Sequence, residues 1–384
     1  MPPACAALVR QSSSRRKQEA LRRVSSTSSM RRKPEALRYG EKTIMNWTAP
    51  DNWLKIKTID AHTGGESLRI IIDGLPEIKG KTILEKRRFF RENHDYIRTG
   101  LMWEPRGHAD QYGAILTEAT TPDGDLGVFF LHNEGYSTMC GHAIIAITKT
   151  VFDTKIIEKT SENPTLKLDT PAGRVVATAH SENGIVHSVS FVNVPSFVYK
   201  LNQKIEVAGI GTVEYDIAYG GAFYVFCDAD KLGIGLQPKD HNQLIDWGKR
   251  IKYAVMEAMP IVHPYEEDLG FLYGVIFIGK ANEAAHHSRN VCIFAEGEVD
   301  RSPTGTGVSA RAAIHHTRNE IGVGESITIE SILGTLMTVE VLETTTFGEH
   351  KAVIPQVTGT ASIIGQNEFY FDPMDDLREG FIFR

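Results

Sequence analysis

The sequence contains no apolar segment that could cross a bilayer. A membrane-spanning helix needs about 20 consecutive apolar residues, whereas apolar runs such as Val189–Val194 and Val275–Ile278 are only a few residues long. Hydrophobic residues make up 41% of the 384 residues and charged residues 23%, which are ordinary values for a globular chain. We therefore expect a soluble protein with no membrane partner.

Cysteine is also scarce, with four in the whole chain and no apparent secretory signal, which excludes a disulfide framework. Cys227 and Cys292 lie in apolar, strand-like runs and are expected to be packing residues. The chain lacks HExxH and CxxC, and neither His286-His287 nor His315-His316 has the spacing of metal ligands on a helix. No glycine pair extends to the dinucleotide-binding GxGxxG pattern. We expect no metal and no cofactor.

Net positive charge is confined to the N-terminal segment. Residues 1–45 hold 11 lysines and arginines against 3 glutamates, which leaves 31 basic and 45 acidic residues in the rest of the chain. That body carries a formal charge of −14 within a total of −6. A nucleic-acid groove needs cations that neutralise phosphates, so this balance argues against nucleic acid as a partner.

The basic segment, residues 1–45, is rich in Ser and Arg and poor in bulky apolar residues. This composition predicts a disordered tail, because too little apolar surface is available to order it. It also fits a mitochondrial presequence, and Met45 offers an alternative start. We predict a cytoplasmic protein, with a mitochondrial location as the alternative.

From Trp47 onward, short β-rich runs are broken by Gly and Pro, and long helical stretches are few. Helices are predicted at Thr82–Asn93, His142–Phe152, Gln243–Met259 and Gly307–Arg318. Strands are predicted at Lys55–Ile59, Leu68–Ile72, Ala114–Leu116, Gly127–Leu131, Arg174–Ala179, Val189–Val194, Phe223–Cys227, Tyr273–Phe277, Val291–Phe294, Ser326–Ile329 and Leu336–Val341. Strands punctuated by helices indicate the α+β class.

Three features recur in the same order in the two halves of the chain. The first half has a double glycine ending at Gly65, then Cys140-Gly-His before a small-residue helix, then Gly173 opening a strand. The second half has a double glycine ending at Gly221, then Thr304-Gly-Thr before a similar helix, then Leu333-Gly334 opening a strand. Matching order and near-matching spacing predict two similar lobes that face each other across a cleft. Cys140 and Thr304 would then occupy equivalent positions.

Cys140 lies just before an apolar helix, within Ser137-Thr-Met-Cys-Gly-His142. Unpaired backbone N–H groups and the helix dipole favour an anion at such an end. They should lower the pKa of the thiol and favour the thiolate that a catalytic base requires. From this position alone, a buried structural cysteine is an equally good interpretation.

The second candidate motif is Asp300-Arg-Ser-Pro-Thr-Gly-Thr-Gly307. Its glycines open a helix N-terminus that could hold a carboxylate on backbone N–H groups, and Asp300 could bind a substrate ammonium. An ordinary capping turn, with Thr304 or Thr306 at the N-cap, explains the same residues.

Together these motifs resemble the proline racemase family over residues 52–383. The resemblance is carried by Asp60-Ala-His-Thr-Gly-Gly-Glu66, Arg106-Gly-His-Ala-Asp110, Met139-Cys-Gly-His142, Ile217-Ala-Tyr-Gly-Gly221 and Asp300-Arg-Ser-Pro-Thr-Gly-Thr-Gly307. It implies a fold similar to diaminopimelate epimerase, in which each of two pseudo-symmetric lobes wraps a β-sheet around a central helix. It also implies a homodimer that works without a cofactor. We place the first lobe at residues 46–178 plus 358–384 and the second at 179–357.

In racemases of this family two cysteines flank the α-carbon of the substrate. Cys140 matches the first, whereas position 304, the place of the second, holds threonine. A threonine hydroxyl is far too weak an acid to replace a thiol near neutral pH. Cys140 alone can still remove the α-proton if the carbanion expels a leaving group. The resemblance therefore predicts the dehydration of trans-3-hydroxy-L-proline to Δ1-pyrroline-2-carboxylate and water.

By the same resemblance, the N–H groups of Gly141, His142, Gly305 and Thr306 would hold the substrate carboxylate, and Asp300 would bind the ring nitrogen. Cys140 and Thr304 are the predicted catalytic pair. Two alternatives stay open. One is a proline racemase or hydroxyproline 2-epimerase, in which Thr304 or a water relays the second proton. The other is a non-catalytic amino-acid-binding relative.

Overall fold

The structure, a computed structural model, describes residues 47–383. From Asp51 onward the chain forms one compact unit. The predictions for residues 1–45, a disordered tail or a targeting segment, lie outside the described residues. None of the helices within residues 47–383 is both long enough and apolar enough to cross a membrane.

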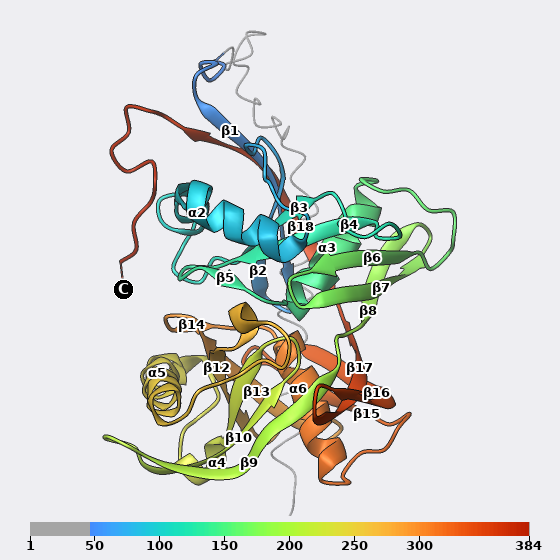
Figure 1. The fold of residues 1–384 in the computed structure, drawn as a ribbon, viewed down its shortest axis with the longest axis vertical. Helices are drawn as coiled ribbons and strands as arrows, with labels where there is room; N and C mark the ends of the chain where they lie inside the picture. The colour runs from blue at the N-terminus through green and yellow to red at the C-terminus, as the bar shows by residue number, and fades with distance from the viewer. Residues whose placement is uncertain (1–46, 384) are drawn as a thin grey trace, which may run out of the picture. The chain divides into compact units, whose positions relative to one another are not determined.

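The first half of the chain forms eight strands and two helices (Figure 1). The helices are α2 (Ile83–Met102) and α3 (Gly141–Asp153). The strands are β1 (Leu54–Thr63), β2 (Glu66–Asp73), β3 (Gly113–Thr117), β4 (Leu126–Leu131), β5 (Tyr136–Ser137), β6 (Thr165–Thr170), β7 (Gly173–Glu182) and β8 (Ile185–Val192).

The second half forms ten strands and three α-helices, with short 3-10 turns at Pro238–Asp240 and Glu267–Leu269. The helices are α4 (Ala229–Leu232), α5 (His241–Ala258) and α6 (Gly305–Thr317). The strands are β9 (Ser196–Val207), β10 (Gly211–Tyr219), β11 (Phe223–Asp228), β12 (Leu272–Gly279), β13 (Ser288–Phe294), β14 (Glu298–Val299), β15 (Ser326–Glu330), β16 (Leu336–Phe347), β17 (His350–Gly359) and β18 (Ala361–Phe371).

The described strands are hydrogen-bonded into one continuous, mostly antiparallel sheet. Parallel pairs occur at β2–β3, β4–β6, β11–β12 and β13–β15. β17 pairs with β16 and β9 and also with β8, so it joins strands from both halves of the chain. The last strand, β18, returns to pair with β1. Residues far apart in the sequence are thereby held in fixed register.

Helices α3 and α6 are each enclosed by strands (Figure 1). α3 packs against β1, β7, β8 and β18, and its residues from Gly141 to Thr148 are all buried. α6 packs against β9, β10, β16 and β17, and its residues from Gly305 to Ile314 are all buried. A helix that is apolar or small on every side has no face to offer water and is therefore buried. This enclosure sets the N-termini of both helices deep in the protein.

The predicted helices and strands are all present, with different ends. The helix predicted at Thr82–Asn93 continues to Met102 past a non-helical residue at His94, and the strand predicted at Val189–Val194 ends at Val192. The prediction missed β6, β9, β10, β17 and β18, as well as the very short β5 and β14. In β18 partly exposed and exposed residues alternate, because one face contacts solvent. The polar residues on such a face hide the strand pattern in the sequence.

Candidate active site

The N-termini of α3 and α6 meet at two glycines. A Cβ built on Gly141 would lie 2.6 Å from Cα of Gly305, and one built on Gly305 would lie 2.6 Å from Cα of Gly141. Only residues without side chains allow this approach. Cys140 and Thr304 are the N-cap residues of the two helices, so the predicted pair flanks the place where the helices meet.

Cys140 lies inside this site and is only 5% exposed. Its Sγ is 3.1 Å from Nδ1 of His142. Burial raises the pKa of the thiol well above its usual value, while the backbone N–H of Ala143 and the Tyr112 hydroxyl lower it by less. The prediction that the helix end lowers this pKa is therefore wrong for the enclosed site, because loss of solvation outweighs the helix N–H groups.

His142 is held from both its backbone and its ring. Its carbonyl accepts a hydrogen bond from Thr63 Oγ1 at 2.7 Å, and its ring packs edge-on against Tyr112. Burial lowers the pKa of the His142 ring to about 3, so the imidazole is neutral near pH 7. A neutral ring beside Sγ can exchange a hydrogen bond with the thiol without adding charge to the site.

Thr304 has a strained backbone. Its φ is +70° and its ψ is 94°, a conformation that β-branched residues rarely adopt and that costs about 1–3 kcal/mol. Three hydrogen bonds hold this turn: Asn290 Nδ2 donates to the Pro303 carbonyl at 3.1 Å, Thr304 N donates to Ser302 Oγ at 3.1 Å, and Val308 N donates to the Thr304 carbonyl at 2.8 Å. The Thr304 side chain is buried, and Oγ1 forms no hydrogen bond of normal geometry among residues 47–383.

Asp300 is a buried carboxyl beside Thr304. Its Oδ1 accepts a hydrogen bond from Ser302 N at 2.7 Å, and it is 3% exposed. Burial raises its pKa to about 6, and its hydrogen bonds to Ser302 and its proximity to Thr304 only partly oppose this. Near neutral pH this carboxyl is mainly ionised, so it can receive a cationic group.

A second buried carboxyl, Glu66, lies behind Asp300. Its Oε2 accepts a hydrogen bond from Arg301 N at 2.7 Å, while Oε1 has no partner among the described residues. Burial, followed by the charge of Asp300, raises the pKa of Glu66 well above its usual value. Through its hydrogen bond with Arg301 N, Glu66 connects β2 to the loop before α6.

The seven predicted site residues line one small cavity. Its remaining walls are aromatic or apolar and come from Tyr112, Met139, Tyr224, Tyr273 and Phe294. The Tyr224 hydroxyl is 2.7 Å from Thr306 Oγ1. The cavity measures about 20 Å³, room for about one water molecule. None of these five residues was predicted to line the site. Tyr224, Tyr273 and Phe294 lie in strands, where a period of two does not show which face meets a ligand.

Other residues of the family motifs lie elsewhere. Arg106 donates to the carbonyls of Tyr370 and Arg378, and Asp110 pairs with Arg301 at 2.8 Å. Cys227 is buried outside the cavity. Cys292 is also buried, but it lies close enough to Asp300 and Thr304 for both to influence its pKa. A packing role for Cys292 therefore stays a prediction, and the structure adds that its neighbours include Asp300 and Thr304.

Comparison with known proteins identifies the class. The structure superposes on that of a hydroxyproline epimerase from Agrobacterium vitis with bound trans-4-hydroxy-L-proline, with a TM-score of 0.82 and 30% sequence identity over 86% of this chain and 96% of that one. The chain therefore has the diaminopimelate epimerase-like fold that the family resemblance implied.

The family follows from the sequence itself. The family described as proline racemase matches residues 58–382, and the chain belongs to this family of enzymes. A relative named trans-3-hydroxy-L-proline dehydratase from Colwellia psychrerythraea is 49% identical over 87% of this chain and 94% of its own length. A relative of the same name from Bacillus cereus is 46% identical over 85% of this chain and 97% of its own length.

Proposed function

We propose that this protein dehydrates trans-3-hydroxy-L-proline to Δ1-pyrroline-2-carboxylate and water, with Cys140 as the only thiol base. The observation that carries the proposal is the pairing of Cys140 with Thr304 at the ends of two helices that line one cavity. A second thiol base is missing where a two-base racemase would need one. The two relatives named for this dehydration support the same reaction.

Substrate binding would use groups already aimed at the cavity. The N-terminal N–H groups of α3 and α6, at Gly141, His142, Gly305 and Thr306, would hold the carboxylate. The same N–H groups would stabilise the negative charge that spreads onto it when the α-proton leaves. Asp300 would receive the ring ammonium. Because that ammonium offsets a carboxylate that raises the pKa of Cys140, binding would itself favour the thiolate.

The chemical step balances with one thiol. In trans-3-hydroxy-L-proline the α-hydrogen and the 3-hydroxyl lie on the same face of the ring. The Cys140 thiolate takes the α-proton, and the C–H electron pair forms the double bond between Cα and C3 as the C3–O bond breaks. The departing hydroxyl takes the proton from the Cys140 thiol and leaves as water. The enamine then tautomerises to the cyclic imine, and Cys140 is again a thiolate.

The cavity must open for this reaction, because a ring with a carboxylate does not fit a space of about 20 Å³. We propose that the two lobes, one built around α3 and the other around α6, separate to admit the substrate and close to exclude water. The proposal includes a cofactor-free homodimer in the cytoplasm, with the mitochondrion as the alternative location.

The test is to supply trans-3-hydroxy-L-proline in deuterated water and to assay the cyclic imine. Imine without α-deuterium in recovered substrate supports the proposal. A second candidate, a hydroxyproline 2-epimerase, is favoured by the structural match to such an epimerase. It would instead place deuterium at the α-carbon and yield the D-isomer. A binding protein would form neither the imine nor the D-isomer. Epimerisation, or the absence of any product, would overturn the proposed dehydration.

A further inference from the structure

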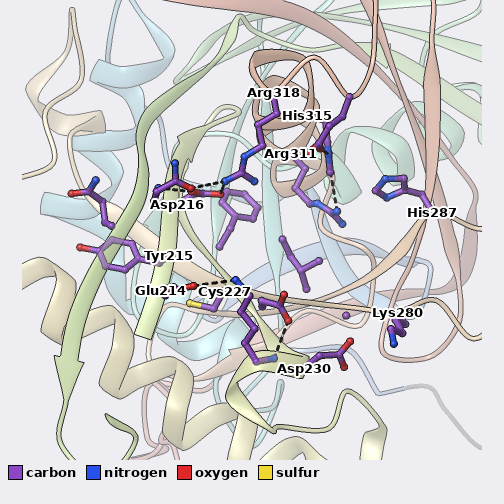
Figure 2. A pocket seen from close by; sticks show the side chains of 18 of the residues that line it. Glu214, Tyr215, Asp216, Cys227, Asp230, Lys280, His287, Arg311, His315 and Arg318 are labelled. Carbon is purple, nitrogen blue, oxygen red and sulfur yellow. Dashed lines mark hydrogen bonds and ion pairs between the residues drawn. The ribbon is translucent and has the colours of Figure 1, made fainter. Parts of the chain in front are cut away.

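A second and larger pocket lies along the C-terminal half of α6, apart from the catalytic cavity (Figure 2). It measures about 480 Å³, within the range of small-molecule sites. None of its lining residues belongs to the catalytic cavity. Its walls come from β9, β10, β11, the end of β12 and α6. The pocket therefore needs its own explanation.

Most charges in this pocket are paired with one another. Glu214 contacts Lys204 at 2.7 Å and Lys231 at 3.0 Å, and Asp216 contacts Arg318 at 2.8 Å. Asp228 caps α4 by accepting from the backbone of Lys231, and Asp230 is exposed. These acidic groups are therefore satisfied or solvated without a ligand.

Arg311 differs because it is buried and, among the described residues, directly contacts only uncharged groups. One terminal nitrogen donates to Ser288 Oγ at 2.6 Å and to Asn290 Oδ1 at 2.9 Å, and the other donates to His315 Nε2 at 2.9 Å. Nε has no partner among residues 47–383. Burial lowers its pKa to about 10, so Arg311 still carries its charge at neutral pH.

The one carboxylate that acts on Arg311 does so at a distance. Glu320 contacts Nδ1 of His315 rather than the guanidinium. Because Arg311 can only donate, His315 Nε2 accepts and its Nδ1–H faces Glu320. The inner wall of the pocket thus presents a buried cation that makes no direct contact with a carboxylate of residues 47–383. Burying a cation in this way is costly, and a bound anion would remove the cost.

We propose that this pocket is a binding site for a small oxyanion, a carboxylate or a phosphate group, held on Arg311 and flanked by Lys280 and His287. Lys280 and His287 lie on the same side of the pocket as seen in Figure 2. The His287 ring is 4.8 Å from that of His315, and its Nδ1 is 2.9 Å from Ser288 Oγ. A bound oxyanion would supply the anionic partner that Arg311 lacks among the described residues.

The proposed site is linked to the catalytic cavity through a single side chain. Arg311 donates to Asn290 Oδ1, and Asn290 Nδ2 donates to the carbonyl of Pro303, which precedes the strained Thr304. An anion that draws Arg311 away from Asn290 would loosen this turn. Occupancy of the pocket should therefore change the catalytic rate as well as bind the anion.

The test is a calorimetric titration of the intact protein with inorganic phosphate and, separately, with acetate. We expect saturable binding of at least one anion, and which one binds identifies the source as phosphate or carboxylate. Lys280→Ala and His287→Gln should each weaken binding about tenfold or more. These rim variants keep the test decisive even if Arg311→Gln fails to fold. Lys351→Ala, an exposed lysine on β17, is the matched control and should leave the affinity unchanged.

Two outcomes overturn the proposal: neither anion binds, or the rim variants and the control bind with equal affinity. Initial rates with trans-3-hydroxy-L-proline, with and without the bound anion, test the link to Thr304. Anion binding with unchanged rates keeps the site and overturns the link. If the protein does not dehydrate trans-3-hydroxy-L-proline but still binds the anion, and Lys280→Ala weakens that binding, only the proposed dehydration is contradicted.

Discussion

Gly141 and Gly305 are in contact across the ends of two helices that lie 164 positions apart in the chain, with only 2.6 Å between Cα of one and a Cβ built on the other. This contact lets the N–H groups of both helices face the same small cavity. A methyl group on either glycine would push the helices apart and would enlarge the distance between Cys140 and Thr304.

We therefore predict that Gly305→Ala lowers kcat/KM by about 100-fold or more, because small displacements of aligned groups are costly in catalysis. The measurement is steady-state kinetics with trans-3-hydroxy-L-proline. Gly135→Ala is the matched control, since a Cβ there meets nothing within 4 Å. Equal activities of the two variants would show that close approach of the helices is not required.

Cys140→Ser should abolish imine formation, with a loss of at least about 10³-fold, because a hydroxyl is a far weaker acid than a thiol. Cys227→Ser removes a buried thiol outside the cavity and serves as the control for general damage. Substantial turnover by Cys140→Ser would contradict the single-thiol mechanism.

Thr304→Cys should introduce exchange of the α-proton and some racemisation of proline, because it places a thiol opposite Cys140. The assay is deuterium incorporation at the α-carbon together with optical rotation. Thr304→Ser, which adds no thiol, is the control. A folded cysteine variant without exchange would contradict the equivalence of positions 140 and 304.

Asp300 gives the site a pH dependence. Its pKa is raised to about 6, so the carboxylate that would bind the substrate ammonium is lost as the pH falls through 6, and KM should rise there. The same raised pKa affects the stability of the fold in the opposite direction. The folded state binds the proton of Asp300 more tightly than the unfolded chain does. The stabilisation that this proton provides is therefore present at low pH and is lost as the pH rises from about 4 to about 6.

Asp300→Asn should consequently raise the free energy of unfolding at pH 8, by at most about 3 kcal/mol because the pKa of Asp300 is raised to about 6, while weakening substrate binding. Urea denaturation at pH 5 and pH 8 measures the first effect and KM the second. A variant that is destabilised equally at both pH values would contradict the raised pKa of Asp300.

Glu66 should tolerate an uncharged amide. Burial disfavours the ionised carboxylate and raises its pKa. Glu66→Gln keeps an acceptor for Arg301 N and should therefore change the free energy of unfolding by less than about 1 kcal/mol. Glu66→Ala leaves that N–H unpaired in the interior and should cost about 1–3 kcal/mol. Denaturant unfolding distinguishes the two, and equal losses would contradict this prediction.

The sequence was a good guide to local structure, and it singled out seven residues that the structure places around one cavity. The apolar helix after Cys140, the small-residue helix after Thr304 and the matching glycines all follow from short-range patterns, and these patterns also carry the family resemblance. Strands with one solvent-exposed face, such as β9 and β18, were missed because their polar residues break up the apolar pattern.

By itself, the sequence predicted that one helix begins beside Cys140 and another beside Thr304, and it determined that position 304 carries no thiol. Only the tertiary structure decided that the two helix ends touch, that Thr304 is strained, that tyrosines wall the cavity and that burial raises rather than lowers the pKa of Cys140. The physical reason is that a helix end acts over one turn, whereas desolvation depends on every segment that packs around the group. Those segments are distant in the sequence and become neighbours only when the sheet closes around both helices.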